Sequence, residues 1–394
     1  MNTYILSAVR TPIASFQGSF SNLPAPRLGA IAIKAALEKA QVPADDIDEV
    51  IMGEVLTAGV GQAPARQAAI YSGLPSSVPC MTINKVCGSG LKALMLASDS
   101  IKLGETQVAV AGGQENMTLA PHLMENSRAG FRMGPVSMSD SMIKDGLWDP
   151  YSDFHMGNAG EICAKEYKFS REEQDQFSKE SYELAISAQN KGYFNNEIIA
   201  VEIPLKDKTL TVSTDEEPGK VKFDKMTSLR PAFSKDGTIT AANASKINDG
   251  ASAIVVASED YVKSKNLKPL ARIVSHATFA QDPKWFTTAP VGAIKKALEK
   301  AKLTVEQIDL FEINEAFAIV AMAAIRDLKI PRNKVNPHGG AVALGHPIGA
   351  SGARVMTTLV HALKTHNKKY GLATLCIGGG EAVAVIVENV SGSL

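Results

Sequence analysis

The 394-residue sequence has no excess of charge of either sign, because 41 Lys and Arg residues balance 41 Asp and Glu residues. A neutral chain has no overall field that would attract nucleic acid or an anionic membrane surface. The sequence also lacks any apolar run near the ~20 residues that a membrane-spanning helix needs. We therefore expect neither nucleic acid nor a membrane as a partner, and any anionic ligand must be held by local contacts.

Cysteine and histidine are scarce, and neither shows a metal-binding spacing. The seven histidines contain no HExxH, and the four cysteines form neither a CxxC pair nor a disulfide framework: Cys80, Cys87, Cys163 and Cys376. Residues 1–9 run almost directly into a strand-like sequence, without a basic region, an apolar core and a cleavage site. These absences predict a cytoplasmic protein without a metal site.

Two common nucleotide-binding motifs are also missing. No GxGxxG follows the first predicted strand, and the glycine-rich stretch 345–352 has no Walker lysine. Neither a Rossmann dinucleotide site nor a P-loop is expected.

The chain contains an internal duplication. Residues 34–51 align without a gap with residues 295–312, and Ser89-Gly-Leu-Lys92 is echoed by Ser351-Gly-Ala-Arg354. A chain of this length predicts two or three domains. Repetition on this scale predicts two similar α/β halves that face each other.

The first half reads as alternating strands and helices. We predict strands at residues 4–9 and 49–55 and a helix at residues 28–40. After the glycine-rich helix of each half, a buried strand is predicted to end in glycines, at residues 108–113 and 372–380.

Between the halves, from about residue 117 to about residue 248, methionines, prolines and scattered charges replace the apolar strand pattern. One strong helix is predicted there, beginning at the capping box Ser170-Arg-Glu-Glu173 and ending near Gly192. We interpret this segment as an inserted domain built largely of loops. Long insertions of this kind usually cover or bind something, although a structural or oligomer-contact role explains it as well.

Cys87 is the first candidate catalytic residue. It lies between an apolar strand-like lead-in and a predicted helix that starts near Gly88 and Gly90. The positive end of a helix favours an anion, so we predict a lowered pKa for the Cys87 thiol. A buried, inert cysteine is the competing interpretation.

Three further residues occupy strand ends or helix starts. Asn314 ends a repeat strand, although a helix cap explains it equally well, and Cys376 ends a buried strand before three glycines. His346 lies between glycines just before a helix, and in the duplication Gly349 takes the place of Cys87. Together these residues predict one cleft. Two other histidines are interpreted as surface residues at a helix end: His361 and His366.

Four motifs then occur in a fixed order: Val86-Cys-Gly-Ser-Gly, Asn314-Glu-Ala-Phe, Gly345-His-Pro-Ile-Gly-Ala-Ser-Gly-Ala-Arg and Cys376-Ile-Gly-Gly-Gly. In this order and at these separations the sequence resembles the thiolase family, from Ser7 to the last strand. The resemblance implies a thiolase fold of class α/β, with five αβαβα layers from two duplicated halves and an inserted loop domain. It divides the chain into an N-terminal half at 1–117 plus 249–270, a loop domain covering coenzyme A at 118–248, and a C-terminal half at 271–394.

The resemblance also implies an activity. Biosynthetic thiolases are acetyl-CoA C-acetyltransferases, which join two acetyl-CoA molecules reversibly into acetoacetyl-CoA and CoA through an acyl-cysteine intermediate. No tightly bound cofactor is implied, because the coenzyme A thioesters are substrates. The family further implies a homotetramer built from two dimers.

The same resemblance assigns roles to the candidate residues. Cys87 is the nucleophile, His346 its base, and Cys376 the group that removes an α-proton from the second acetyl-CoA. Asn314, through a water, is expected to stabilise the enolate together with His346. The backbone N–H groups of Cys87 and Gly378 are expected to bind the tetrahedral oxyanion.

Contacts to coenzyme A are implied for Leu147, His155, Met156, Phe233, Ala241 and Ser245, and Phe286 is expected to line the acyl pocket. Weaker candidates for the phosphates are Lys220, Lys222, Lys225 and Arg230. Residues 215–218 lack the Tyr that helps mitochondrial relatives bind potassium, so no monovalent-ion requirement is expected. Glu381 departs from the family pattern, which often has a small or neutral residue at that position.

Three alternatives remain open at this stage. A degradative 3-ketoacyl-CoA thiolase would accept longer chains with the same chemistry. A cysteine hydrolase would leave Cys376 without a role and would release the acyl group to water. A non-catalytic acyl-CoA binding protein on the same scaffold would form no acyl adduct at Cys87.

Overall fold

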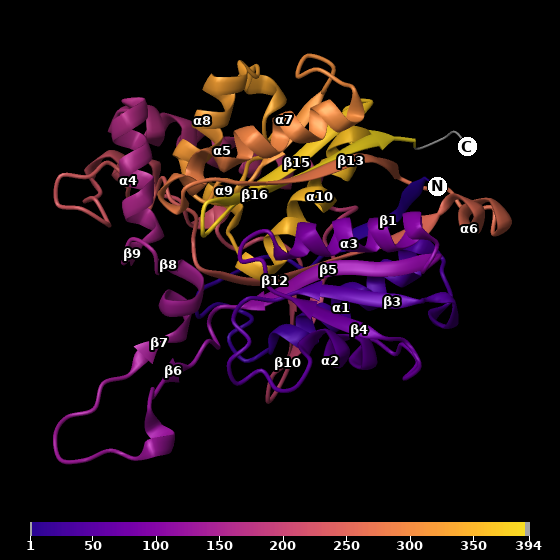
Figure 1. Cartoon of the computed structure of the whole chain (residues 1–394), viewed down its shortest axis with the longest axis horizontal. Helices are drawn as coiled ribbons and strands as arrows, with labels where there is room; N and C mark the ends of the chain where they lie inside the picture. Colours follow the sequence, from indigo (N-terminus) through magenta and orange to yellow (C-terminus); the bar gives the residue numbers. More distant parts are fainter. Residues whose placement is uncertain (1, 391–394) are drawn as a thin grey trace.

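The computed structural model describes residues 2–390 and has two helices at its centre, between two layers of β-strands (Figure 1). These helices are α3 (Ser89–Leu103) and α10 (Ile348–Thr365). Their apolar residues form one core with the inner faces of both strand layers, including Ile254 and Leu375. Both central helices are therefore buried along most of their length and exposed only near their C-terminal ends.

Further helices cover the outer face of each strand layer (Figure 1). On the N-terminal side these are α1 (Ala25–Ala40) and α2 (Pro64–Tyr71), and on the C-terminal side α7 (Ala289–Ala301) and α8 (Ala318–Leu328). Each outer pair forms its own apolar cluster with the sheet beneath it. The five αβαβα layers predicted from the sequence are present.

The N-terminal strands have the order β4-β3-β5-β12-β1. β3 pairs in parallel with β4 and β5, whereas β12 is antiparallel to both β5 and β1. The strands are β1 (Thr3–Arg10), β3 (Glu49–Gly53), β4 (Cys80–Ile83), β5 (Val108–Asn116) and β12 (Asn248–Ser258), and the short β2 (Ala14–Ser15) adds to β12.

The C-terminal strands repeat this plan in the order β14-β15-β16-β13. β14 is parallel to β15, and the other pairs are antiparallel. β1 and β13 also pair, through Thr3 to Ile5 and Ala271 to Ile273, so the two layers are joined at one edge. The strands are β13 (Ala271–Ala280), β14 (Leu310–Ile313), β15 (Tyr370–Ile377) and β16 (Glu381–Asn389).

The duplication extends to the helix ends. α1 stops at Gln41 and α7 at Lys302, each in the left-handed conformation with φ 55°. The strand that follows is β3 in one half and β14 in the other. The predicted ends of the glycine strands differ from the structure in both halves, because β15 already stops at Ile377, before the three glycines. β5 continues to Asn116, and a Cβ added to Gly113 would lie 2.1 Å from the Gly349 carbonyl oxygen, so this glycine lets α10 approach the sheet.

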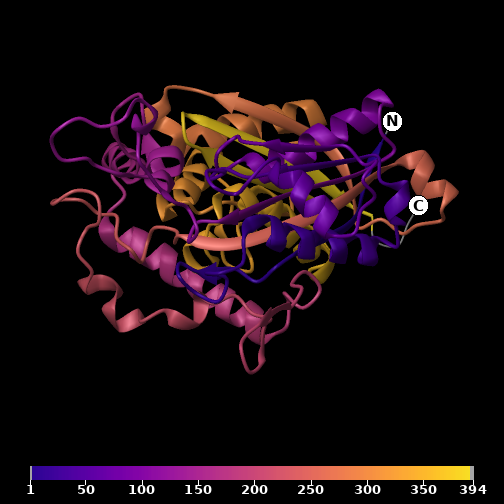
Figure 2. The same ribbon diagram turned by 90° about the horizontal axis from the view of Figure 1, so that it is seen from below.

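The inserted segment lies mostly at the end of the molecule opposite the two termini (Figures 1 and 2). The capping-box helix predicted near residue 170 is α5 (Arg171–Asn190), which runs along the outside of the core in Figure 2. A second helix, α4 (Met156–Tyr167), was not predicted. Glycine lowers helix propensity, and α4 contains Gly157 and Gly160, whose missing side chains make room for Phe233 and Ile239.

Short elements make up much of the remaining insertion. They are β6 (His122–Leu123), β7 (Ser139–Asp140), a helical turn at Met142–Leu147, β8 (Trp148–Asp149), β9 (Phe154–His155), β10 (Val201–Pro204), β11 (Thr209–Val212) and turns at Pro218–Lys220 and Phe223–Ser228. Outside the insertion, α6 (Glu259–Ser264), α9 (Ala341–Leu344) and turns at Ala44–Asp46, Pro283–Thr288 and Arg332–Lys334 complete the described chain.

The domain boundaries given above stay a prediction, and residues 391–394 of the predicted C-terminal half lie outside the described residues. Within residues 2–390, no helix combines the length and the apolar character needed to cross a membrane.

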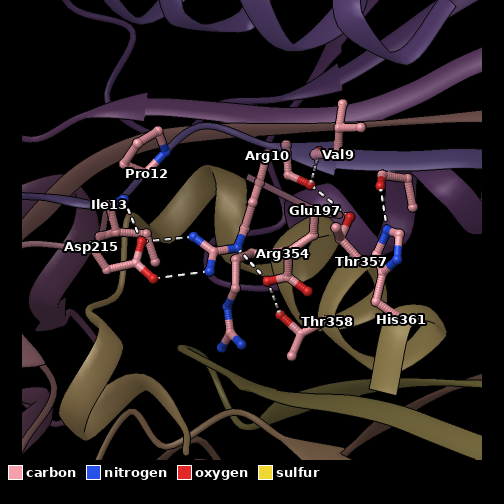
Figure 3. Close-up of polar contacts among 12 residues, drawn as sticks. Val9, Arg10, Pro12, Ile13, Glu197, Asp215, Arg354, Thr357, Thr358 and His361 are labelled. Atoms are coloured by element: carbon pink, nitrogen blue, oxygen red, sulfur yellow. Dashed lines mark hydrogen bonds and ion pairs between the residues drawn. The ribbon is translucent and has the colours of Figure 1, made fainter. Parts of the chain in front are cut away.

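Arg10 anchors the inserted segment to β1 (Figure 3). Its guanidinium is fully buried, with Nε 2.6 Å from Glu197 Oε1 and Nη1 2.7 Å from Asp215 Oδ1. Asp215 also accepts a hydrogen bond from the backbone N–H of Ile13 at 2.8 Å. One cation of the core therefore pairs with two carboxylates of the insertion.

His361 lies in the same buried region (Figure 3), so its interpretation as a surface residue is wrong. Its Nε2 lies 2.9 Å from the Ala8 carbonyl oxygen, and burial lowers the pKa of the ring. The helix α10 that carries His361 is buried along most of its length, which its sequence pattern alone does not reveal. His366, at the end of that helix, is exposed as predicted.

Arg10→Met is expected to lower the free energy of unfolding by about 3–5 kcal/mol, because it leaves two buried carboxylates without their partner. Urea denaturation followed by circular dichroism measures the change. Lys263→Met removes an exposed i,i+4 pair with Glu259 and serves as the control, with an expected loss of about 0.3–0.5 kcal/mol. Equal losses in the two variants would contradict the anchoring role.

Candidate active site

Cys87 lies in a tight turn that leads into α3, whose N-cap is Gly88. Within the turn, the Val86 N–H donates to Asn84 Oδ1 at 2.9 Å and the Lys85 N–H donates to Ser89 Oγ at 2.8 Å. Val86 has φ 44°, a conformation that a β-branched residue rarely adopts. Such strain persists only where the surrounding structure enforces it, and it often marks a functional site.

The predicted lowering of the Cys87 pKa is wrong. Burial raises the pKa of this thiol to about 12, although the N–H groups of Gly378 and Cys87 itself favour the thiolate. The negative charge of Glu115 adds to the increase. Desolvation therefore outweighs the helix end, and Cys87 is a neutral thiol at neutral pH.

His346 is held by contacts from three segments. Its backbone N–H donates to Asn248 Oδ1 at 2.9 Å, and its Nδ1 lies 2.6 Å from Ser351 Oγ. Ser351 Oγ in turn donates to the Pro347 carbonyl at 2.9 Å. Since the hydroxyl proton is used there, Nδ1 carries the imidazole proton and Nε2 presents its lone pair.

The electrostatic surroundings keep His346 neutral. Burial lowers the pKa of its imidazole to about 3, and the charge of Arg354 acts in the same direction. A neutral imidazole beside a neutral thiol can accept the thiol proton when the sulfur attacks.

Asn314 lies directly beside His346. Its Nδ2 is 3.4 Å from His346 Nε2, and its backbone N–H donates to the Thr374 carbonyl at 3.0 Å. Its Oδ1 is buried and has no hydrogen-bond partner among residues 2–390, which leaves it able to bind a substrate or a water.

Cys376 and Gly378 come from the end of β15 and bring the C-terminal half to Cys87. Cys376 is fully buried, and burial raises its pKa well above the ordinary value. The charge of a Cys87 thiolate also raises the pKa of Cys376, so the two sulfurs lie within electrostatic range of each other. A Cβ added to Gly378 would lie 3.7 Å from the side chains of both Val86 and Met156.

A cavity of about 220 Å³ opens next to His346. It shares part of its lining with a wider cavity of about 500 Å³ that reaches Lys220 and Ala241. Four residues predicted to contact coenzyme A line the inner cavity: Leu147, His155, Phe233 and Ser245. His155 stacks on Phe233 with ring centroids 4.8 Å apart, and its Nδ1 accepts the Gly157 N–H at 3.0 Å.

Other predicted contacts lie outside this lining. Met156 and Phe286 belong to the apolar cluster around Cys376. Phe317, whose ring centroid lies 6.3 Å from that of Phe286, lines the inner cavity. The side chain of Lys220 pairs with Glu216 at 3.2 Å. Three phosphate candidates are exposed and are absent from both linings: Lys222, Lys225 and Arg230.

Two residues near the site, the buried Glu115 and the half-buried Lys246, were missed by the sequence analysis. Glu115 accepts backbone N–H groups from Val55, Leu56 and Gly349, at 3.1, 3.2 and 2.8 Å, and burial raises its pKa to about 7. Lys246 lines both cavities and donates to the carbonyls of Ala244 and Val342. An acid at a strand end and a lysine in a loop give no local signal, because their roles depend on distant backbone.

Comparison with known proteins agrees with this architecture. The family model described as "Thiolase, N-terminal domain" matches residues 3–260, and the one described as "Thiolase, C-terminal domain" matches residues 267–389. A thiolase from Ascaris suum, solved in complex with coenzyme A, superposes with a TM-score of 0.94 at 44% identity, covering 99% of this chain and 100% of that one.

Curated relatives that align over nearly the whole chain have a similar level of sequence identity to it. An acetyl-CoA acetyltransferase from Cupriavidus necator is 53% identical over 387 residues, and one from Schizosaccharomyces pombe is 48% identical over 390 residues. A probable acetyl-CoA acyltransferase from Staphylococcus aureus is 50% identical over 387 residues. Each alignment covers 98% of both chains. Family models and relatives alike span nearly the whole sequence, and the chain belongs to the thiolase family.

Proposed function

We propose that this protein is an acetyl-CoA C-acetyltransferase, which condenses two acetyl-CoA molecules reversibly into acetoacetyl-CoA and CoA. The observation that carries the proposal is that His346 lines a cavity and contacts Asn314, while the thiols of Cys87 and Cys376 influence each other electrostatically. The names of the similar full-length proteins support the same activity. CoA thioesters act as substrates, and no tightly bound cofactor is needed.

The first half-reaction acylates Cys87. Its sulfur bonds to the thioester carbon of acetyl-CoA while its proton passes to His346 Nε2. The N–H groups of Cys87 and Gly378, which already face the sulfur, bind the oxyanion that forms. The C–S bond to coenzyme A then breaks, and the departing thiolate takes the proton of Cys376. The site now holds an imidazolium and a Cys376 thiolate.

The second half-reaction forms the carbon–carbon bond. The Cys376 thiolate removes an α-proton from a second acetyl-CoA, and its raised pKa makes it a strong base for this weak acid. The imidazolium N–H of His346 and the Asn314 side chain stabilise the enolate oxygen. The enolate carbon attacks acetyl-Cys87, the Cys87 thiolate leaves, and it recovers its proton from His346.

The two connected cavities are suited to the long, narrow pantetheine arm. We assign the arm to Leu147, His155, Phe233, Ala241 and Ser245. Met156 and Phe286 belong to the same apolar cluster as Cys376. Lys220, which lines the wider cavity, is the best-placed cation for the phosphates, and Lys225 is a weaker candidate.

We further propose a homotetramer formed from two dimers. β4 lies at the sheet edge with Met81 exposed, which favours pairing with a second copy. An arm at residues 122–140 protrudes from the body (Figure 1) and exposes large apolar side chains: Met124, Phe131, Met133, Val136 and Met138. Monomers rarely expose such patches. The four free cysteines favour a reducing compartment, which supports a cytoplasmic location.

The acyl chain length of the preferred substrate distinguishes this activity from that of a degradative thiolase with a broader substrate range. With acetoacetyl-CoA, kcat/KM for thiolysis is expected to exceed that for C8 and longer ketoacyl-CoA by at least about tenfold, because the cavity beside His346 is small and is closed in by Phe317. Spectrophotometric thiolysis assays across the series measure this ratio, with Cys87→Ala as the blank. Equal rates at C4 and C8 would favour the degradative enzyme.

Replacement of Cys87 and replacement of Cys376 are expected to block different steps of the reaction. Cys87→Ala loses thiolysis and forms no acetyl adduct with acetyl-CoA. Cys376→Ala keeps the adduct on Cys87 and loses condensation by about 10²- to 10⁴-fold, the usual contribution of a general base. Intact-mass spectrometry after incubation with acetyl-CoA distinguishes them. An adduct on Cys87→Ala, or none on Cys376→Ala, would overturn the assignment.

The raised pKa of Cys87 has a measurable consequence in the free enzyme. The thiolate is the reactive form, and its fraction rises with pH up to a pKa of about 12. Alkylation of Cys87 by iodoacetamide is therefore expected to accelerate by about tenfold per pH unit between pH 7 and 9. Peptide mass spectrometry, performed in the Cys376→Ser background, gives the rate at Cys87. A plateau below pH 7 would indicate a preformed thiolate instead.

A further inference from the structure

Two turns from opposite halves meet at the oxyanion donors. One turn, residues 84–89, carries Cys87, and the other, residues 377–381, carries Gly378. A Cβ added to Gly88 would lie 2.3 Å from Ile377 Cδ1, so the turns are in direct contact. The N–H groups that face the Cys87 sulfur come from both turns, and their spacing depends on how the turns are held.

The turn around Cys87 is braced by side-chain hydrogen bonds, whereas the Gly378 turn is built of three glycines and closes the hairpin between β15 and β16. Asn84 and Ser89 brace the first turn through their side chains. In the second, Gly379 and Gly380 have φ 89° and 83° and carry no side chains that could pack. Glycine is the most mobile residue type, so the contacts at the two ends of this turn decide where the Gly378 N–H lies.

A single ion pair holds the Gly378 turn on the side that faces Cys87. Lys85 Nζ bonds Glu381 Oε2 and so links the residue before Val86 with the residue after the three glycines. Apart from the contact between the Gly378 N–H and the Cys87 sulfur, this is the only polar interaction that joins the two turns among residues 2–390. On the opposite side, the Gly380 carbonyl accepts the Gln281 N–H at 2.9 Å.

We propose that the Lys85–Glu381 ion pair, which we call the clamp, positions the Gly378 N–H against Cys87 for acyl transfer. Both residues act through Gly378 and are positioning residues. The inference rests on the proposed function, because the oxyanion belongs to that reaction. It also gives a role to Glu381, the residue that departs from the family pattern.

The clamp adds little to overall stability. Its side chains are 23% and 35% exposed, and exposed pairs contribute about 0–1 kcal/mol. Catalysis is more sensitive, because removing one oxyanion donor lowers kcat by about 10²–10³-fold. A donor that is loosened rather than removed is expected to cost about tenfold.

The test compares Lys85→Gln, Glu381→Gln, the double variant and the charge-reversed pair, Lys85→Glu with Glu381→Lys. Each single variant is expected to lower kcat and the rate of Cys87 acetylation about tenfold, with KM for CoA within about twofold of wild type. The double variant is expected to be no slower than either single one, and the reversed pair to recover part of the rate. Lys265→Gln, which breaks a comparably exposed pair with Asp46, is the matched control.

A second measurement does not depend on thiolase activity. Because the Gly378 N–H favours the Cys87 thiolate, Lys85→Gln and Glu381→Gln are expected to slow iodoacetamide alkylation of Cys87 at pH 8 several-fold. Normal kcat and normal alkylation in both variants would refute the clamp, as would additive losses in the double variant. A wild-type protein inactive on acetoacetyl-CoA would refute the proposed function, while the alkylation rates would still decide the clamp.

Discussion

The close contact between α3 and α10 is the constraint on which the rest of the structure depends. A Cβ on Gly90 would lie 2.6 Å from the Ala353 nitrogen, and one on Gly352 would lie 2.2 Å from the Leu91 nitrogen. The two helices therefore touch, backbone against backbone, near their N-terminal ends. Because Cys87 and His346 lie just before those ends, this one contact brings the proposed nucleophile and the proposed base together. Any larger residue at either glycine would push the two halves apart at the site.

The duplication supplies the frame, and the chemistry comes from where the copies differ. Asn314 matches Gly53, and a Cβ on Gly53 would lie 2.6 Å from Ser89 Cβ, so no side chain fits there. In the C-terminal copy the same position is free to hold an amide beside His346. Gly349 similarly matches Cys87, and its N–H binds Glu115. In the proposed mechanism, one copy thus provides the acyl-accepting thiol, and the other provides the base, the enolate donor and the second thiol.

Much of the fold could be predicted because its signals are local. The capping box at Ser170 and the glycine motifs around Cys87, His346 and Cys376 each fall within a few residues of sequence. The repeat is visible when residues 34–51 are aligned with residues 295–312. The Cys87 pKa could not be predicted, since burial is set by residues from both halves. The same is true of the proton position on His346, which depends on Ser351 and Pro347. Helix α4 was missed because Gly157 and Gly160 lower its helix propensity. These glycines are needed for close packing against Phe233 and Ile239.

The place of β12 in the sheet affects how the chain can fold during synthesis. β12 lies between β1 and β5, yet more than a hundred residues of insertion separate it from β5 along the chain. Until residue 258 has left the ribosome, β1 has no partner strand that joins it to β5. The N-terminal layer therefore closes late, and its exposed strand edges must be protected from misassociation while the insertion is being translated.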